Sequence, residues 1–204
     1  MRRGSWSAVE AAVLAAMSGL SATEELLRER LAKRASAIEF TRKIRADERV
    51  RFTRRRVEMD ITWVTERIAV GGGIWNADNM EAVSRAGITH IIDMQLEFDD
   101  TPLARPHGIA VCWNPVDDDF EPKPPEVFAR GVEFGLAALE GDGTKLFVHC
   151  AAGVHRAPMM ALALLGVMGW TVEDGMDLIE SRRPAADFAE VYVRSVEEFL
   201  EGRS

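Results

Sequence analysis

The run that most constrains the fold of this chain reads HCAAGVHRAP and covers residues 149–158. Before it, residues 145–148 have the apolar character of a short buried strand, and after it residues 158–165 have that of a buried helix. The sequence therefore predicts that the run is the turn between a strand and a helix. In an α/β fold such a turn lies at the carboxyl end of a strand, where ligands bind.

Cys150 and Arg156 lie six positions apart around Gly153 in this turn. Successive backbone N–H groups in a strand-to-helix turn can point inward and bind an anion, and the positive end of the helix dipole adds to their field. The same field favours a thiolate at Cys150, and the planar guanidinium of Arg156 can hold two phosphoryl oxygens. The spacing predicts a phosphate site with a nucleophile. The predicted phosphate-binding residues are Ala151, Ala152, Gly153, Val154, His155 and Arg156.

The loop resembles that of the cysteine-dependent phosphatases, and the dual-specificity branch most closely. Residues 61–72 are similar to the entry strands of that family, and residues 82–93 to its next helix, turn and strand. The resemblance covers about residues 60 to 200 and implies a metal-independent phosphatase without a cofactor. It also implies that His149 orients the loop and supports the thiolate.

The chemistry needs an acid, because the leaving oxygen must be protonated as Cys150 attacks phosphorus. Three adjacent carboxylates, Asp117 to Asp119, follow an apolar strand over residues 109–113 and open a proline-rich loop. Relatives in the family carry a movable general-acid aspartate there, and Asp118 matches its position best, with Asp117 as the reserve. Mutual repulsion in the triplet is expected to favour the protonated form of one carboxyl.

Ala157 departs from the family pattern, in which Ser or Thr usually follows the loop arginine. A hydroxyl there helps the cysteine thiolate to leave when water hydrolyses the phosphocysteine, so the sequence predicts slow breakdown of the phosphoenzyme. The departure also leaves open a second class of protein, a pseudophosphatase that binds a phosphorylated partner without turning it over.

Three residues inside the loop, Ala151, Ala152 and Val154, are apolar. Inositol-lipid phosphatases of the superfamily often carry basic residues there, so highly charged lipids suit this loop less well. Phosphotyrosine, phosphoserine or phosphothreonine in a protein is the main expectation. Phosphatases of lipid, sugar or nucleotide phosphates are the alternative, and a small phosphomonoester stays open as a substrate.

Charge divides the chain into two regions. Residues 1–57 carry 14 Lys and Arg against 7 Asp and Glu, whereas residues 58–204 carry 11 against 26. We expect residues 58–204 to be the catalytic domain, which is acidic enough to repel nucleic acid and anionic lipid. Residues 1–57 are expected to be a basic, helical N-terminal extension. It could dock on an acidic partner, RNA or anionic lipid; packing against its own acidic domain or a second copy of the chain is the favoured expectation.

The rest of the chain fits one α/β domain with a central, mostly parallel sheet flanked by helices. Helical patterns cover residues 126–139, 158–168, 171–181 and 187–200, with Thr171 and Asp187 as expected N-caps. The apolar stretch 157–170 is too short to span a bilayer, so no transmembrane segment is expected. No metal-ligand cluster is evident. A nucleophilic Cys150 must stay reduced, which predicts a cytoplasmic location.

Overall fold

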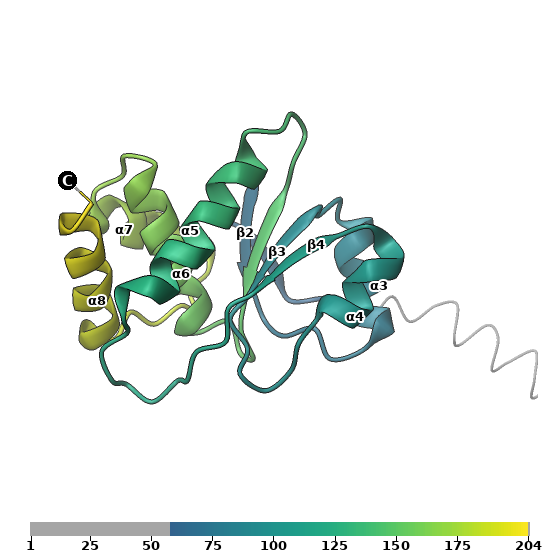
Figure 1. Cartoon of the computed structure of the whole chain (residues 1–204), viewed down its shortest axis with the longest axis horizontal. Helices are drawn as coiled ribbons and strands as arrows, with labels where there is room; N and C mark the ends of the chain where they lie inside the picture. Colours follow the sequence, from purple (N-terminus) through teal and green to yellow (C-terminus); the bar gives the residue numbers. More distant parts are fainter. Residues whose placement is uncertain (1–57, 204) are drawn as a thin grey trace, which may run out of the picture. The chain divides into compact units, whose positions relative to one another are not determined.

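Five short strands form one sheet in the computed structural model, which describes residues 58–203 (Figure 1). The order across the sheet is β1-β2-β5-β3-β4, with β1 antiparallel to β2 and the other neighbours parallel. The expected mostly parallel sheet is therefore confirmed. The predicted basic extension, residues 1–57, lies outside the described residues. The strands are β1 (Ile61–Trp63), β2 (Ile68–Gly71), β3 (His90–Asp93), β4 (Ala110–Trp113) and β5 (Leu146–His149).

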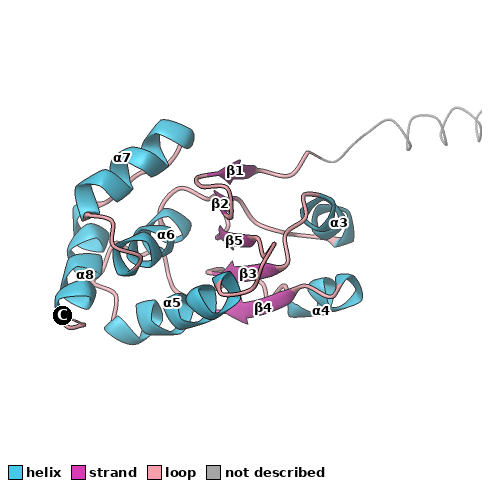
Figure 2. Ribbon diagram, turned by 90° about the horizontal axis from the view of Figure 1, so that it is seen from above, coloured by secondary structure: helices cyan, strands magenta, loops and turns pink. Residues whose placement is uncertain are grey.

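Helices cover both faces of the sheet (Figure 2). Two of them, α3 and α4, pack on one face, and α5 to α8 gather on the other. No helix within residues 58–203 combines the length and the apolar character that crossing a bilayer requires. The helices are α3 (Ala77–Arg85), α4 (Thr101–Ala104), α5 (Pro125–Leu139), α6 (Arg156–Val167), α7 (Val172–Arg182) and α8 (Glu190–Glu201), with a 3₁₀ turn over Arg105–His107.

The central strands are rich in apolar residues because both of their faces are buried. In β5, Leu146 and Val148 join the core beneath α5 to α8, whereas Phe147 joins the core beneath α3 and α4. This alternation follows from the two-residue period of a strand, and burial on both faces is typical of parallel strands. It explains why the short run before His149 contains no polar residue on either face.

Helix α6 is the buried central helix, as the apolar pattern predicts. Its residues from Arg156 to Leu165 are all buried. It begins at Arg156, two residues before the predicted start, so Pro158 lies in its first turn, where a missing backbone N–H costs no helical hydrogen bond. The loop arginine is therefore a helix residue and is held by the rigid start of α6.

One predicted N-cap is confirmed and the other is wrong. The Thr171 side chain accepts a hydrogen bond from the Asp174 N–H and caps α7. Helix α8, however, begins at Glu190 after Ala189, so Asp187 does not cap it. The Asp187 N–H instead donates to the Val154 carbonyl at 2.9 Å, which ties the segment before α8 to the phosphate loop.

The parallel register brings three loops to one edge of the sheet. Asp93 is paired with His149 on one side and Trp113 on the other, at the ends of β3, β5 and β4. The loops that follow these strands, residues 94–100, 114–124 and 150–155, therefore leave the sheet side by side. This edge is where the sequence-predicted nucleophile and acid can meet.

Candidate active site

The phosphate loop joins β5 to α6 and carries Cys150 at its start. The Cys150 side chain is buried, and the Gly153 N–H donates to its Sγ at 3.2 Å. Gly153 has a φ of 68°, and a Cβ at this position would lie 2.5 Å from the Gly71 carbonyl oxygen. The positive φ and the close Gly71 carbonyl both require glycine at position 153. In this conformation the Gly153 N–H points at the Cys150 sulfur and can stabilise negative charge on it.

Arg183 braces the loop from outside and was not anticipated from the sequence. Its Nε donates to the Gly153 carbonyl at 2.7 Å, and its Nη2 donates to the Ala152 carbonyl at 3.4 Å. A planar trans peptide points its N–H away from its C=O, so holding these carbonyls outward turns the following N–H groups toward the pocket. The brace therefore supports the anion-binding geometry of the loop.

Asp60 holds Arg183 in turn. Its two carboxylate oxygens accept from Nη1 and Nη2 of Arg183 at 2.8 and 2.6 Å. The hydrogen bond from Arg183 lowers the pKa of Asp60 below its usual range. The pair joins the segment before β1 to the end of α7, so the loop is fixed by residues far from it in sequence.

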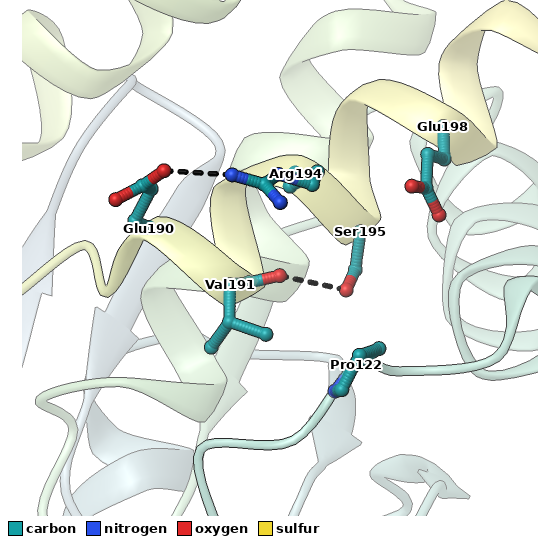
Figure 3. A pocket seen from close by; sticks show the side chains of 6 residues that line it. All are labelled: Pro122, Glu190, Val191, Arg194, Ser195 and Glu198. Atoms are coloured by element: carbon teal, nitrogen blue, oxygen red, sulfur yellow. Dashed lines mark hydrogen bonds and ion pairs between the residues drawn. The ribbon is translucent and has the colours of Figure 1, made fainter.

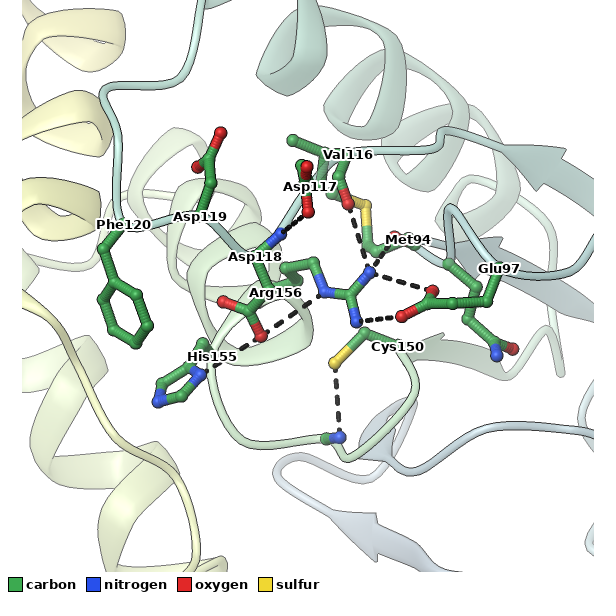
Figure 4. A network of polar contacts seen from close by, with 12 residues as sticks. Met94, Glu97, Val116, Asp117, Asp118, Asp119, Phe120, Cys150, His155 and Arg156 are labelled. Atoms are coloured by element: carbon green, nitrogen blue, oxygen red, sulfur yellow. Dashed lines mark hydrogen bonds and ion pairs between the residues drawn. The ribbon is translucent and has the colours of Figure 1, made fainter.

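Arg156 lies beside Cys150, but its guanidinium is already engaged (Figure 4). Glu97 accepts from Nη1 at 3.1 Å and from Nη2 at 2.9 Å, and the Val116 carbonyl accepts from Nη1 at 3.1 Å. Burial acts to lower the pKa of Arg156, but Glu97, Cys150 and Asp118 outweigh it and the pKa is raised. The same hydrogen bonds lower the pKa of Glu97. Glu97 is a second site residue that sequence reasoning missed.

The Nε of Arg156 faces Asp118 on the acid loop. It lies 3.6 Å from the Asp118 Oδ2 and makes no hydrogen bond in the structure. A buried N–H without a partner is costly, so this group is available to a phosphoryl oxygen. Asp118 and Arg156 thus approach each other across the space above Cys150.

Of the three aspartates, Asp118 alone reaches the phosphate loop among the described contacts (Figure 4). Its Oδ2 lies 3.2 Å from the His155 Nδ1, and its Oδ1 accepts from the Tyr192 hydroxyl at 3.1 Å. Asp117 accepts from the Asp118 N–H at 2.8 Å and is exposed to solvent. The structure therefore brings Asp118, and not its reserve Asp117, to the site.

Asp119, the third carboxylate of the triplet, is paired with Lys123. The hydrogen bond from Lys123 lowers the pKa of Asp119 instead of raising it. Asp119 is therefore not the carboxyl of the triplet whose protonated form is favoured.

His149 lies in a buried cluster behind Cys150. Its Nε2 is 2.8 Å from the Asp100 Oδ2 and 3.7 Å from the Asp93 Oδ1, and all three side chains are fully buried. Burial raises the pKa of Asp93 to about 7. The cluster links β5 to the 94–100 loop that carries Glu97. The role of His149 in orienting the phosphate loop stays a prediction.

The same cluster is the group within residues 58–203 whose ligand atoms lie close enough to hold a metal ion, within 4.8 Å of one another. Both Asp93 oxygens accept backbone N–H groups, from Gln95 and Asp100, and the His149 Nε2 lies 2.8 Å from the Asp100 Oδ2. These contacts connect the end of β5 to the 94–100 loop.

A buried thiol in a strand-to-helix loop, an arginine at the start of the helix and an aspartate over both define the class of cysteine-dependent phosphatases. Within that class, the family model for the dual specificity phosphatase catalytic domain matches residues 74–201. This chain belongs to that family. The match includes the phosphate loop, the acid loop and α8, and begins after β2.

Curated relatives agree with this assignment. Protein phosphatase Slingshot homolog 3 of Rattus norvegicus is 31% identical over 116 residues, covering 55% of this chain and 17% of the relative. Protein tyrosine phosphatase type IVA 3 of Homo sapiens is 31% identical over 109 residues, covering 52% of this chain and 62% of the relative. The alignments span less than two thirds of either relative.

Solved structures share the fold. The structure of PTPMT1 in complex with PI(5)P superimposes with a TM-score of 0.63 at 18% identity, covering 70% of this chain and 95% of that one. DUSP15 gives a TM-score of 0.60 at 26% identity, covering 69% of this chain and 86% of that one. The α/β architecture predicted from the sequence is therefore confirmed.

Proposed function

We propose that this protein is a metal-independent phosphatase that hydrolyses phosphomonoesters through a phosphocysteine on Cys150. The observation that carries the proposal is the convergence of the loop residues Cys150 and Arg156 with the distant Asp118 on one edge of the sheet. Family membership and the phosphatase relatives support it. No cofactor takes part in the proposed reaction.

In the first step the Cys150 thiolate attacks phosphorus, a sulfur–phosphorus bond forms and the bond to the leaving oxygen breaks. The loop N–H groups and Arg156 hold the phosphoryl oxygens, and the unpartnered Arg156 Nε–H donates to one of them. Asp118 gives its proton to the leaving oxygen. Glu97 keeps the guanidinium in place through its other two nitrogens.

In the second step water attacks the phosphocysteine, Asp118 takes the proton of that water, and Cys150 leaves as a thiolate. The Gly153 N–H stabilises the departing sulfur. Ala157 is fully buried at the start of α6 and offers no hydroxyl for this task. Hydrolysis of the intermediate is therefore the slower step in the proposed cycle.

Phosphorylated tyrosine, serine or threonine in proteins is the proposed substrate class. Ala151, Ala152 and Val154 are apolar and offer no charge to a multiply phosphorylated headgroup. The structural relative PTPMT1 was solved with PI(5)P, so lipid phosphates are the competing class to be measured beside phosphopeptides. The proposed location is the cytoplasm, and docking of an acidic partner by residues 1–57 stays a prediction.

The test is phosphate release from para-nitrophenyl phosphate and a phosphotyrosine peptide in the presence of a metal chelator. Cys150→Ser should abolish release, and Asp118→Asn should lower it by about 10²-fold or more, the usual contribution of a general acid. Cys112→Ser is the matched control, because Cys112 lies in β4 as the other free cysteine within residues 58–203. That variant should keep its activity.

The chemical state of Cys150 distinguishes the covalent route from simple phosphate binding. A phosphate adduct on Cys150 after rapid acid quench, seen by mass spectrometry, supports the covalent route. Turnover that survives Cys150→Ser overturns it. Wild-type protein that binds vanadate or a phosphopeptide but releases no phosphate would establish the pseudophosphatase class instead.

A further inference from the structure

Tyr192, the single tyrosine of the chain, is buried on α8 against the loop that carries Asp118. Its hydroxyl donates to the Asp118 Oδ1 at 3.1 Å and accepts from the Phe120 N–H at 2.9 Å. We infer that Tyr192 is a positioning residue that sets which oxygen of Asp118 carries the catalytic proton. This inference rests on the proposed function and extends it to a residue outside the loop and its acid.

The directions of these two hydrogen bonds follow from simple counting. A phenol has one proton to donate, and a backbone N–H can only donate. Because the hydroxyl oxygen accepts from Phe120, its own proton is directed to the Asp118 Oδ1. Oδ1 is therefore occupied as an acceptor, and a proton on Asp118 belongs on Oδ2.

Oδ2 is the oxygen on the side of the phosphate loop. It lies 3.6 Å from the Arg156 Nε and 3.2 Å from the His155 Nδ1. As the sulfur–phosphorus bond forms and the leaving oxygen departs, the proton passes from Oδ2 to that oxygen and Asp118 becomes a carboxylate. The Tyr192 hydrogen bond to Oδ1 is then made to an ion, so it is stronger in the product of the transfer than before it.

The same tyrosine also holds the backbone of the acid loop. Phe120 has a φ of 58°, which is unfavourable for a residue with a side chain. The Phe120 ring stacks on the Tyr192 ring with centroids 5.8 Å apart, and it meets the His155 ring edge-on with centroids 5.0 Å apart. Two contacts from Tyr192 thus compensate the strained residue two positions after Asp118.

A second contact between this loop and α8 supplies a control. Ser195 accepts from the Lys123 N–H at 3.0 Å, one turn beyond Tyr192 on α8, and it donates to the Val191 carbonyl. Ser195, Pro122 and other α8 residues line a pocket of about 350 Å³. Figure 3 shows these side chains, and none of them contacts Cys150, Arg156 or Asp118 among the described hydrogen bonds and ion pairs. Ser195→Ala therefore loosens the loop without removing a partner of Asp118.

The test compares Tyr192→Phe with wild type on two aryl phosphates. One has a leaving group that departs readily as an anion, such as para-nitrophenol, and the other has a poor one, such as phenol. We expect kcat/KM to fall about tenfold on the poor leaving group, in keeping with the loss of one hydrogen bond to a charged group, and less than twofold on the good one. Ser195→Ala should lower both by the same factor.

The ratio kcat/KM reports the transfer to Cys150, so slow hydrolysis of the intermediate does not obscure the comparison. In an Asp118→Asn background, Tyr192→Phe should cause no further loss. Equal losses on the two substrates, or a full additional loss in the Asp118→Asn background, would overturn the inference. Wild type without Cys150-dependent turnover would instead overturn the proposed function itself.

A second measurement keeps a tyrosine at position 192 and so does not depend on whether Tyr192→Phe folds. Because the chain has one tyrosine, growth on 3-fluorotyrosine modifies Tyr192 alone. The fluorinated phenol is a stronger donor and favours the Asp118 carboxylate, so the basic limb of the pH profile of kcat/KM should move to lower pH. An unchanged profile would contradict a hydrogen bond from Tyr192 to the acid.

Discussion

Replacing Arg183 with Met tests whether the brace outside the phosphate loop is required for its geometry. The change removes the hydrogen bond to the Gly153 carbonyl at 2.7 Å and the paired bonds to Asp60. Breaking a buried ion pair costs about 3–5 kcal/mol, but the Asp60 side chain is 52% exposed, so water screens much of that part. The bond from a charged donor to a carbonyl is worth about 1.5–3 kcal/mol.

We therefore expect Arg183→Met to lower the free energy of unfolding by about 2–3 kcal/mol and Tm by about 4–12 °C. The freed Ala152 and Gly153 peptides can then rotate, and their N–H groups no longer point at the phosphoryl group in advance. Loss of one such donor typically costs about 10²-fold in rate. The assays are urea unfolding and vanadate inhibition, with kcat/KM on para-nitrophenyl phosphate.

Asp60→Asn is the matched control, because it removes the charge but leaves Arg183 and its bond to Gly153 in place. The lowered pKa of Asp60 means that its stabilising contribution is present above about pH 4, the usual aspartate range, and is lost as the pH falls through the folded-state value. Asp60→Asn should therefore reduce acid sensitivity with little effect on vanadate affinity. Unchanged stability and vanadate affinity in Arg183→Met would refute the role of the brace.

Three further changes address other parts of the site. Ala157→Ser should raise kcat and diminish the burst of product release, measured by stopped flow; an unchanged kcat with no burst in wild type would contradict slow hydrolysis. Gly153→Ala should lose Cys150-dependent activity and about 1–3 kcal/mol of stability because φ is 68° and the Gly71 carbonyl is too close, and native-like activity would contradict this. The pKa of Asp93 is raised to about 7 in the folded protein, whereas in the unfolded chain the carboxyl loses its proton at about pH 4. The contribution of Asp93 to the free energy of unfolding therefore decreases as the pH rises from about 4 to about 7. Asp93→Asn should flatten that part of the pH dependence of urea unfolding, and an identical slope would count against it.

Local sequence patterns determined the elements on which the site is built. The apolar run before His149, the buried helix after Arg156 and the Thr171 cap all appear where their periodicity and side-chain chemistry indicate. The six-residue spacing of Cys150 and Arg156 identified the nucleophile loop for the same reason. Such features depend on neighbouring residues, whose relative positions follow from the backbone geometry of a strand, a turn or a helix.

Tertiary structure alone decided which distant residues complete the site. Glu97 on Arg156, Asp60 on Arg183 and Tyr192 on Asp118 are pairs separated by 59, 123 and 74 positions, and no local pattern connects their members. The same holds for Asp187, whose expected cap at α8 is replaced by a contact with the phosphate loop. These partners were chosen by the parallel register, which brings the ends of β3, β4 and β5 to one edge, and by the packing of α7 and α8 beside it. Side-chain partners in a buried polar site are set by that packing because each buried donor or acceptor must find its match among the groups the fold places within reach.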